Sequence, residues 1–206
     1  MSLGYTPTNS SRILKYNLFY SKQMTKRVFY HSTNKTLSKK YTFKQALFQG
    51  LAQDNGLFMP TQIPKLSETE IMEMKGKPYS EVAYKVLKQF LEYDIELDDL
   101  RKITEESYNF KVPIEKLDRH TFIMRQDQGP TASFKDFAAR IMARLMNKLL
   151  PENNKLTILV ATSGDTGSAV GEAYKGIEGI KVYILYPKSE VSSIQKKTIR
   201  FYWRKY

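Results

Sequence analysis

The segment from residue 156 to residue 186 constrains the fold more than any other part of the sequence. It begins with an apolar run, Leu156 to Ala161, that has the length and composition of a buried strand. A polar loop with two glycines, a helix of small residues that reaches Gly176, and a second strand, Lys181 to Tyr186, follow it. Strand, helix and strand in this order predict a parallel pair joined by a right-handed crossover. We therefore expect the second half of the chain to be α/β in type.

A strand and a long helix are expected just before this unit. The strand covers Thr121 to Arg125, and a turn at residues 127–130 follows it. The helix runs from about Phe134 to Leu150, and Pro151 ends it. Its predicted apolar face consists of Phe137, Ala138, Ile141, Met142, Leu145 and Leu149.

The first half of the chain is expected to be mainly helical. A strand signal at residues 27–30 opens it, and two capping boxes, Thr42 with Gln45 and Ser67 with Glu70, each precede a short helix. Ser80 is expected to open a longer helix with apolar residues on one stripe. Because this half shows no catalytic pattern of residues, we interpret residues 24–118 as a packing domain.

Composition disfavours several classes of function. The sequence has no cysteine and only two histidines, far apart, which argues against a metal site. No apolar run approaches the length of a membrane span. The formal net charge of +12 invites a nucleic-acid interpretation. The two ends supply half of this charge, and the remainder is spread over a body of mixed charge, so nucleic acid is not the expected partner.

Residues 1–23 carry three cations and no acidic residue, and they show no helical period. A disordered extension or an upstream start is the favoured interpretation, with an organelle transit peptide as the alternative. A cytoplasmic location is therefore expected.

The first candidate site is the segment from Gly129 to Phe137, which contains Lys135. The lysine is expected one or two residues into the helix, where a lysine is ordinarily a solvated surface residue. Here, however, the positive end of the helix dipole favours the uncharged amine, the form that a Schiff-base lysine needs. The hydroxyls of Thr131 and Ser133 and the backbone N–H groups of the preceding loop also suit an anionic ligand.

The second candidate site is the glycine loop from Ala161 to Ser168. It follows a strand and opens a helix, where α/β proteins bind ligands. Its glycines, Gly164 and Gly167, allow the backbone to approach a ligand closely. Its hydroxyl groups are hydrogen-bond donors, and they belong to Thr162, Ser163 and Thr166. The alternative is a structural turn in which Asp165 caps the helix. The loop lacks the Gly-Lys-Ser/Thr of a Walker A sequence.

Together these segments resemble the threonine synthase family of fold-type II enzymes, which depend on pyridoxal 5'-phosphate (PLP). The similarity covers most of Lys26 to Lys197. The matching segments are Tyr30–Asn34, Gln49–Pro60, Gly129–Arg140, Ala161–Ser168, Ile184–Lys188 and Val191–Gln195. The resemblance implies a helical N-terminal domain followed by the first part of a parallel sheet with flanking helices.

The resemblance also implies a reaction, in which O-phospho-L-homoserine and water give L-threonine and phosphate. Lys135 would hold PLP and then act as acid and base, and Phe134 and Asp136 would position it. The implied cofactor-binding residues are Lys135, Phe134, Ser163 and Asp165. The implied substrate-binding residues are Thr162, Ser163, Gly164, Asp165, Thr166 and Gly167. Family members often have histidine where this chain has Gln128, so no role is assigned to that position.

The domain organisation that follows is an extension over residues 1–23, a domain over 24–118, a partial catalytic domain over 119–197 and an atypical tail over 198–206. A frameshift is one hypothesis for the tail. Family members continue well beyond this point, and there they supply the loop for the cofactor phosphate and the partner of the ring nitrogen. We therefore expect the chain alone to be inactive or nearly so. Two alternative functions stay open. One is a PLP-dependent phospholyase that gives a keto acid, and the other is a non-catalytic fragment. The sequence does not predict the oligomeric state.

Overall fold

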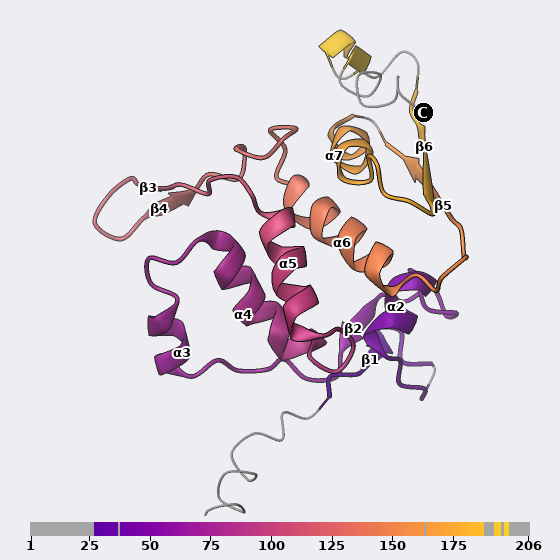
Figure 1. Ribbon diagram of the computed structural model, residues 1–206, viewed down its shortest axis with the longest axis horizontal. Helices are drawn as coiled ribbons and strands as arrows, with labels where there is room; N and C mark the ends of the chain where they lie inside the picture. The colour runs from indigo at the N-terminus through magenta and orange to yellow at the C-terminus, as the bar shows by residue number, and fades with distance from the viewer. Residues whose placement is uncertain (1–26, 37, 163, 188–191, 195, 198–206) are drawn as a thin grey trace, which may run out of the picture.

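The computed structural model describes residues 27–36, 38–162, 164–187, 192–194 and 196–197, shown in Figure 1. The predicted extension over residues 1–23 and the predicted atypical tail over 198–206 lie outside the described residues. The elements in chain order are β1 (Tyr30–Ser32), α2 (Phe43–Gln49), β2 (Phe58–Pro60), α3 (Glu68–Glu73), α4 (Tyr79–Leu91), α5 (Leu97–Ser107), β3 (Ile114–Lys116), β4 (Phe122–Met124), α6 (Asp136–Leu149), β5 (Leu156–Ala161), α7 (Asp165–Ala173) and β6 (Ile180–Leu185).

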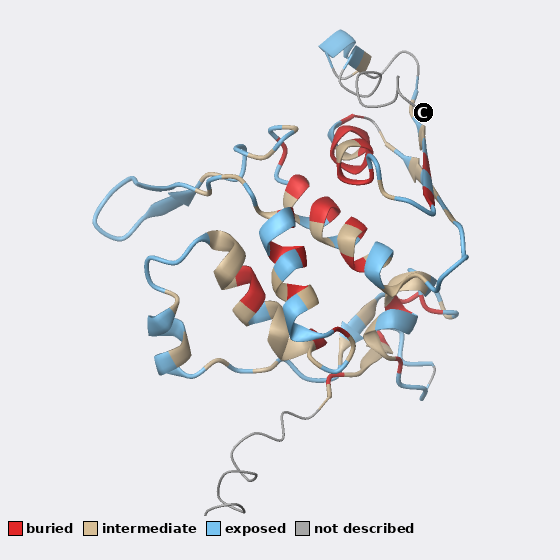
Figure 2. Ribbon diagram, in the orientation of Figure 1, coloured by how far each residue is buried: buried red, intermediate tan, exposed pale blue. Residues whose placement is uncertain are grey.

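Three helices, α4, α5 and α6, lie side by side, with α5 in the middle (Figure 1). Their facing sides are the buried ones (Figure 2). The core between them consists of Tyr84, Leu91, Ile95, Leu100, Ile103 and Leu145. Leu145 belongs to α6, so the helical first half and the α/β second half share one apolar core. The predicted helical character of the first half is confirmed.

Helix α6 is buried on two sides, whereas the sequence predicted one apolar face. Ala139 and Ala143 belong to a second core, together with residues of α7 and of the strands. On the predicted face, Ala138 and Met142 are exposed, so that part of the prediction is wrong. The second buried side exists because small alanine side chains let α7 approach α6 closely. A row of alanines is a weak sequence signal for burial beside large apolar side chains, so the sequence did not predict this side.

Strands β5 and β6 pair in parallel, as the sequence predicted. The register runs from Leu156 opposite Ile180 to Ala161 opposite Leu185, so β6 begins and ends one residue earlier than the predicted strand, Lys181 to Tyr186. Helices α6 and α7 cover one face of the pair. The other face is exposed and includes Leu159 (68% exposed) and Tyr183 (51% exposed). Because the strands are parallel, their carboxyl ends meet at one edge, where the glycine loop begins. The predicted α/β fold, a helical part followed by a parallel sheet with flanking helices, is confirmed.

Strand β3 was not predicted from the sequence. It pairs antiparallel with β4 in a hairpin that projects from the body (Figure 1), with Ile114 opposite Met124. All six strand residues are exposed, so β3 lacks the buried alternation by which strands are recognised. The hairpin spans the boundary that the sequence placed between residues 118 and 119.

The predicted helix starts agree with the structure where a capping box is present. Both capping boxes are present, at Thr42 with Gln45 and at Ser67 with Glu70. The helix expected to open at Ser80 begins instead at Tyr79, after Pro78, without a side-chain cap. Proline is suited to the start of a helix because its missing N–H has no acceptor there anyway. Within the described residues no helix is both long and apolar enough to cross a membrane.

Asp54 ties the two N-terminal strands together. Its carboxylate accepts hydrogen bonds from the hydroxyls of Ser32 and Thr36, both at 2.5 Å, and from the N–H of Gly56 at 3.1 Å. A Cβ at Gly56 would lie 2.0 Å from the Ser32 hydroxyl, so only glycine fits. These contacts join residues 30–34 to residues 49–60, the two N-terminal segments that resemble the threonine synthase family.

We predict that the shared core, and not the exposed sheet face, sets stability. Leu100 is fully buried, and Leu100→Ala should lower the free energy of unfolding by about 2–5 kcal/mol, because it leaves a cavity. Leu159→Ala, on the exposed face, should change it by less than about 0.5 kcal/mol. Urea denaturation measures both; equal losses would contradict this assignment of the core.

We predict a pH-dependent contribution from Asp54. Its hydrogen bonds, led by the one from Ser32, lower its pKa to about 2. The stabilisation is therefore complete above the ordinary pKa of about 3.8 and is lost as the pH falls through about 2. Carbon-13 NMR titration should show this value, and Ser32→Ala should raise it. An Asp54 carboxyl that titrates at its ordinary value would refute the contact.

Candidate active site

Lys135 stands immediately before α6, as its N-terminal cap residue, and not one or two residues inside the helix as predicted. The N–H groups of Asp136 and Phe137 bond three residues back, to Ser133 and Phe134, so the chain turns tightly there. The first helical bond of the α type runs from the N–H of Ala139 to the carbonyl of Lys135, at 2.9 Å. The backbone of Lys135 is thus held on both sides.

The side chain of Lys135 is half-buried, and its amine lies 5.4 Å from the centre of the Phe134 ring. Phe134 itself is 62% exposed. These two predicted cofactor-binding residues are neighbours in the chain, and the contact places the Lys135 amine beside the exposed Phe134 ring.

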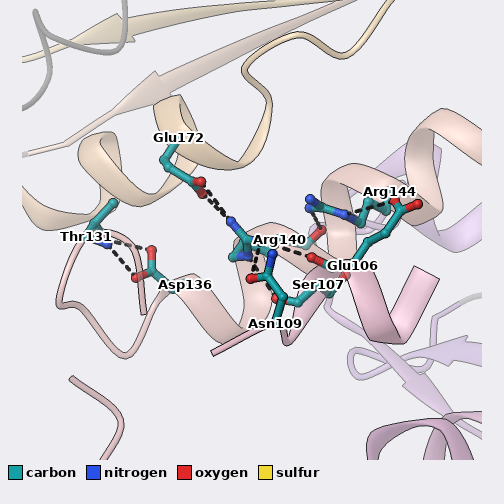
Figure 3. Close-up of polar contacts among 8 residues, drawn as sticks. All are labelled: Glu106, Ser107, Asn109, Thr131, Asp136, Arg140, Arg144 and Glu172. Atoms are coloured by element: carbon teal, nitrogen blue, oxygen red, sulfur yellow. Dashed lines mark hydrogen bonds and ion pairs between the residues drawn. The ribbon is translucent and has the colours of Figure 1, made fainter. Parts of the chain in front are cut away.

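The loop before Lys135 is held from within by Asp136, which is fully buried (Figure 3). The backbone N–H of Thr131 donates to Oδ2 of Asp136 at 2.8 Å, and the Thr131 hydroxyl donates to Oδ1 at 2.6 Å. The N–H of Lys135 donates to the Ser133 hydroxyl oxygen at 3.3 Å. The prediction that the Thr131 hydroxyl serves an anionic ligand is therefore wrong for this conformation, because Asp136 occupies it.

The glycine loop begins at the end of β5. The N–H of Thr162 donates to the carbonyl of Leu185 at 2.9 Å, which continues the strand pairing by one residue. The Thr162 hydroxyl oxygen accepts from the N–H of Gly164 at 3.1 Å. The N-terminal cap residue of α7 is Gly164, and no side chain caps this end of the helix. Asp165 is the first residue inside the helix, so the alternative of Asp165 as the cap is wrong.

The remaining residues of the loop divide between surface and interior. Asp165 is exposed, Thr166 is half-buried, and Gly167 is buried in the first turn of α7. Ser163 was predicted to bind both cofactor and substrate, and it lies outside the described residues. The loop therefore presents Thr162, Asp165 and Thr166 towards its surface.

An open, shallow cavity of about 470 Å³ lies at the carboxyl ends of the two parallel strands. Its lining residues are Ala161, Thr162, Leu185, Tyr186 and Pro187. The position is the one at which open parallel sheets bind ligands. Thr162 connects this cavity to the glycine loop.

A larger cleft, of about 670 Å³, opens between α5, α6 and α7 and is lined by charged side chains, among them Arg140 and Glu172. These two are already bound to each other, at 2.7 Å and 2.9 Å. Burial lowers the pKa of the neighbouring Arg144, and the nearby charge of Arg140 lowers it further. Lys135 is in the lining of neither the cleft nor the strand-end cavity. Because only the strand-end cavity includes a residue of the glycine loop, Thr162, we assign the candidate substrate-binding part of the site to the strand ends.

Arg140 connects the two helices, α6 and α7, that follow the candidate segments (Figure 3). It lies on α6, four residues after Asp136, and binds both carboxylate oxygens of Glu172 on α7. Its other N–H groups donate to the carbonyl of Ser107 at 2.8 Å, the carbonyl of Glu106 at 2.9 Å and the side-chain oxygen of Asn109 at 3.1 Å. All five donors of the guanidinium are therefore used.

The importance of Arg140 was not predicted from the sequence. The only local signal was an arginine beside the alanines of a helix with an apolar pattern. Its partners are 32 and 33 residues away, at Glu172 and Ser107, so the sequence could not identify them. Among the residues that the structure describes, no group of histidine, cysteine and acidic side chains could hold a metal ion.

The comparisons with known proteins agree with this architecture. A family model described as "Threonine synthase N terminus" matches residues 29–108. The threonine synthase of Haemophilus influenzae is 40% identical over 156 residues, which are 76% of this chain. The chain belongs to the threonine synthase family. Its similarity to the family extends beyond the matched N-terminal segment, because the aligned stretch of the Haemophilus relative is longer than that segment.

Solved threonine synthase structures support the same relationship. A structure of PLP-bound threonine synthase from Brucella melitensis has a TM-score of 0.78 and 35% identity and covers 83% of this chain. The Escherichia coli enzyme has a TM-score of 0.75 and 33% identity over the same share. The chain spans 36% of the Haemophilus relative and 38% and 40% of these two structures.

We predict that the Arg140–Glu172 pair is essential for stability. Glu172→Ala leaves the buried guanidinium without its carboxylate, and should lower the free energy of unfolding by about 3 kcal/mol. Glu73→Ala is the matched control, because Glu73 pairs with Lys85 at 2.7 Å on the surface, and it should cost less than about 1 kcal/mol. Chemical denaturation of both variants is the measurement. Similar losses would show that Arg140 does not depend on Glu172.

Proposed function

We propose that this chain carries the lysine-bearing part of a PLP-dependent threonine synthase. The reaction is the conversion of O-phospho-L-homoserine and water into L-threonine and phosphate, a carbon–oxygen lyase reaction. The proposal includes a cytoplasmic location and a small phosphorylated amino acid as partner, and not nucleic acid or a membrane. Because the chain spans under half of its relatives, activity, substrate and cofactor are all part of the proposal.

The observation that carries the proposal is the placement of Lys135. Its backbone is fixed between the Ser133 turn and the first bond of α6, while its side chain extends over Phe134 at the surface of the turn. A lysine that binds a cofactor covalently needs this combination, a rigid base and an amine that a ligand can reach. The solved PLP-bound relative with the same fold supports the choice of cofactor.

The residues around Lys135 fit such a cofactor. PLP, when bound, supplies an electron sink for bond changes next to the substrate nitrogen. We propose that Lys135 binds it covalently beside Phe134, and that the Lys135 amine afterwards moves protons to and from the substrate. Ser163 and Asp165 would complete the cofactor site.

The glycine loop would bind the substrate. Thr162, at the edge of the cavity, and Thr166 have hydroxyl donors, and the start of α7 at Gly164 favours a phosphate or carboxylate group. Ser163, Asp165 and Gly167 complete the proposed substrate-binding set. The strand ends would thus hold the anionic part of the substrate.

The cofactor assignment is tested with the 206-residue chain. Mixed with PLP, it should develop a visible absorbance band that Lys135→Ala abolishes. Lys148→Ala is the matched control, because Lys148 also lies on α6 but pairs with Asp99 at 2.6 Å, and it should keep the band. No band with either the unaltered chain or a version extended to the full length of its relatives, or a band that survives in Lys135→Ala, would refute the proposal.

Product analysis with O-phospho-L-homoserine tests the reaction itself. It uses a version of the chain extended to the full length of its relatives, because the 206-residue chain alone is expected to be inactive or nearly so. Threonine and phosphate in equal amounts support the synthase. A keto acid and phosphate would instead identify a phospholyase, which would use the same lysine. In that case the cofactor assignment would stand and the reaction assignment would be wrong.

A further inference from the structure

We propose that Asp136 is a positioning residue, which holds the turn that presents Lys135 without touching the lysine amine. This inference rests on the proposed function of Lys135. It assigns to Asp136 a specific structural action, the internal closure of the segment from Gly129 to Lys135 through Thr131.

Asp136 is buried in a way that requires partners. Its side chain is fully inaccessible to solvent, and a buried carboxylate is costly unless it is hydrogen-bonded. Each of its two oxygens accepts a hydrogen bond from Thr131. The carboxylate lies on the first residue of α6, where the helix dipole favours a negative charge. Asp136 is thus stabilised when the loop folds back onto it.

Gly129 approaches Asp136 closely from the other end of the loop. A Cβ at this position would lie 2.5 Å from Oδ2 of Asp136 and 2.9 Å from its Cβ. Such distances are too short for any side chain, so the loop closes on Asp136 at two points, Gly129 and Thr131. This contact explains why position 129, in the segment that resembles the family, is a glycine.

Ala132, the residue between these contacts and Lys135, has a strained backbone. Its φ is +54°, in the left-handed region that alanine avoids. Residues stay in such a conformation only when their surroundings hold them there. The Thr131–Asp136 bonds on one side and the bond from the Ala132 N–H to the Gly129 carbonyl, at 3.0 Å, supply that constraint.

Loss of the Asp136 contacts would act on Lys135 through the backbone. Ser133 accepts the N–H of Lys135, and Ser133 follows the strained Ala132. Without the Asp136 contacts, Ala132 is free to relax and the direction in which Lys135 leaves the backbone changes. The expected effect is a loss of selective reaction at Lys135, not a general loss of fold.

The test is site-resolved labelling of the 206-residue chain with PLP and borohydride, read by peptide mass spectrometry. In the unaltered chain Lys135 should be labelled in preference to Lys148, the control lysine on the same helix. Asp136→Asn places an amide donor against one of the two Thr131 donors, and Asp136→Ala removes both contacts. Each should lower the ratio of Lys135 to Lys148 labelling by about tenfold, the scale of a lost charged hydrogen bond.

Two further variants separate positioning from stability. Asp94→Asn alters another buried aspartate, which pairs with Arg27 at 2.7 Å away from the turn, and it should leave the labelling ratio unchanged. Thr131→Val removes the partner hydroxyl and should lower the ratio on its own, but add little to Asp136→Ala. Amide hydrogen exchange at residues 131–133 should be faster in each Asp136 variant.

The outcomes distinguish this inference from the proposed function. If Lys135 of the unaltered chain is not labelled selectively, the proposed function fails and this inference fails with it. If Lys135 is labelled but Asp136→Asn and Thr131→Val leave the ratio unchanged, the positioning role is wrong and the proposed function stands. A third outcome is that Asp94→Asn lowers the labelling ratio as much as Asp136→Asn does, with the two variants melting at the same temperature. That result would assign the effect to general destabilisation and would also overturn the positioning role of Asp136.

Discussion

The side chain of Arg140 is the contact on which the arrangement of the molecule depends. It is almost fully buried, and a buried guanidinium is tolerated only when its charge and its donors are matched. Glu172 of α7 supplies the charge, and the C-terminal end of α5 with Asn109 supplies the remaining acceptors. One side chain on α6 therefore fixes α5 and α7 at once. Since the two candidate segments precede α6 and α7, the same contact sets their relative position.

The segments themselves are stabilised by different means. The turn before Lys135 is closed by a buried carboxylate, by a glycine that leaves room for it, and by an alanine in a left-handed conformation. The glycine loop is instead an extension of the parallel pair, since Thr162 still bonds to Leu185 of the neighbouring strand. The first is an internally constrained turn, whereas the second depends on the sheet. Mutations in the core between α6 and the strands should therefore disturb the glycine loop before they disturb the lysine turn.

The prediction from sequence succeeded where local signals agree with the tertiary context. The capping boxes at Thr42 and Ser67 depend on residues three positions apart, so the sequence contains all of the information. The buried run from Leu156 to Ala161 is likewise a local signal. The predictions failed where burial comes from distant partners. Strand β3 has no buried residue, and Ala139 and Ala143 of α6 face a helix that begins more than twenty residues later.

For the candidate site, the sequence alone determined only the types of residue that are candidates: a lysine at a helix start, and hydroxyls and glycines after a buried strand. It also determined the pattern of a parallel α/β unit. These features are local because side-chain chemistry and hydrophobic periodicity are written in neighbouring residues. Only the tertiary structure decided how these residues are used. It directed the Thr131 donors to Asp136 instead of to a ligand, joined α6 to α7 through Arg140 and Glu172, and left one face of the sheet exposed. Those choices depend on which groups remain unpaired when distant segments are buried together, and a local pattern does not contain that information.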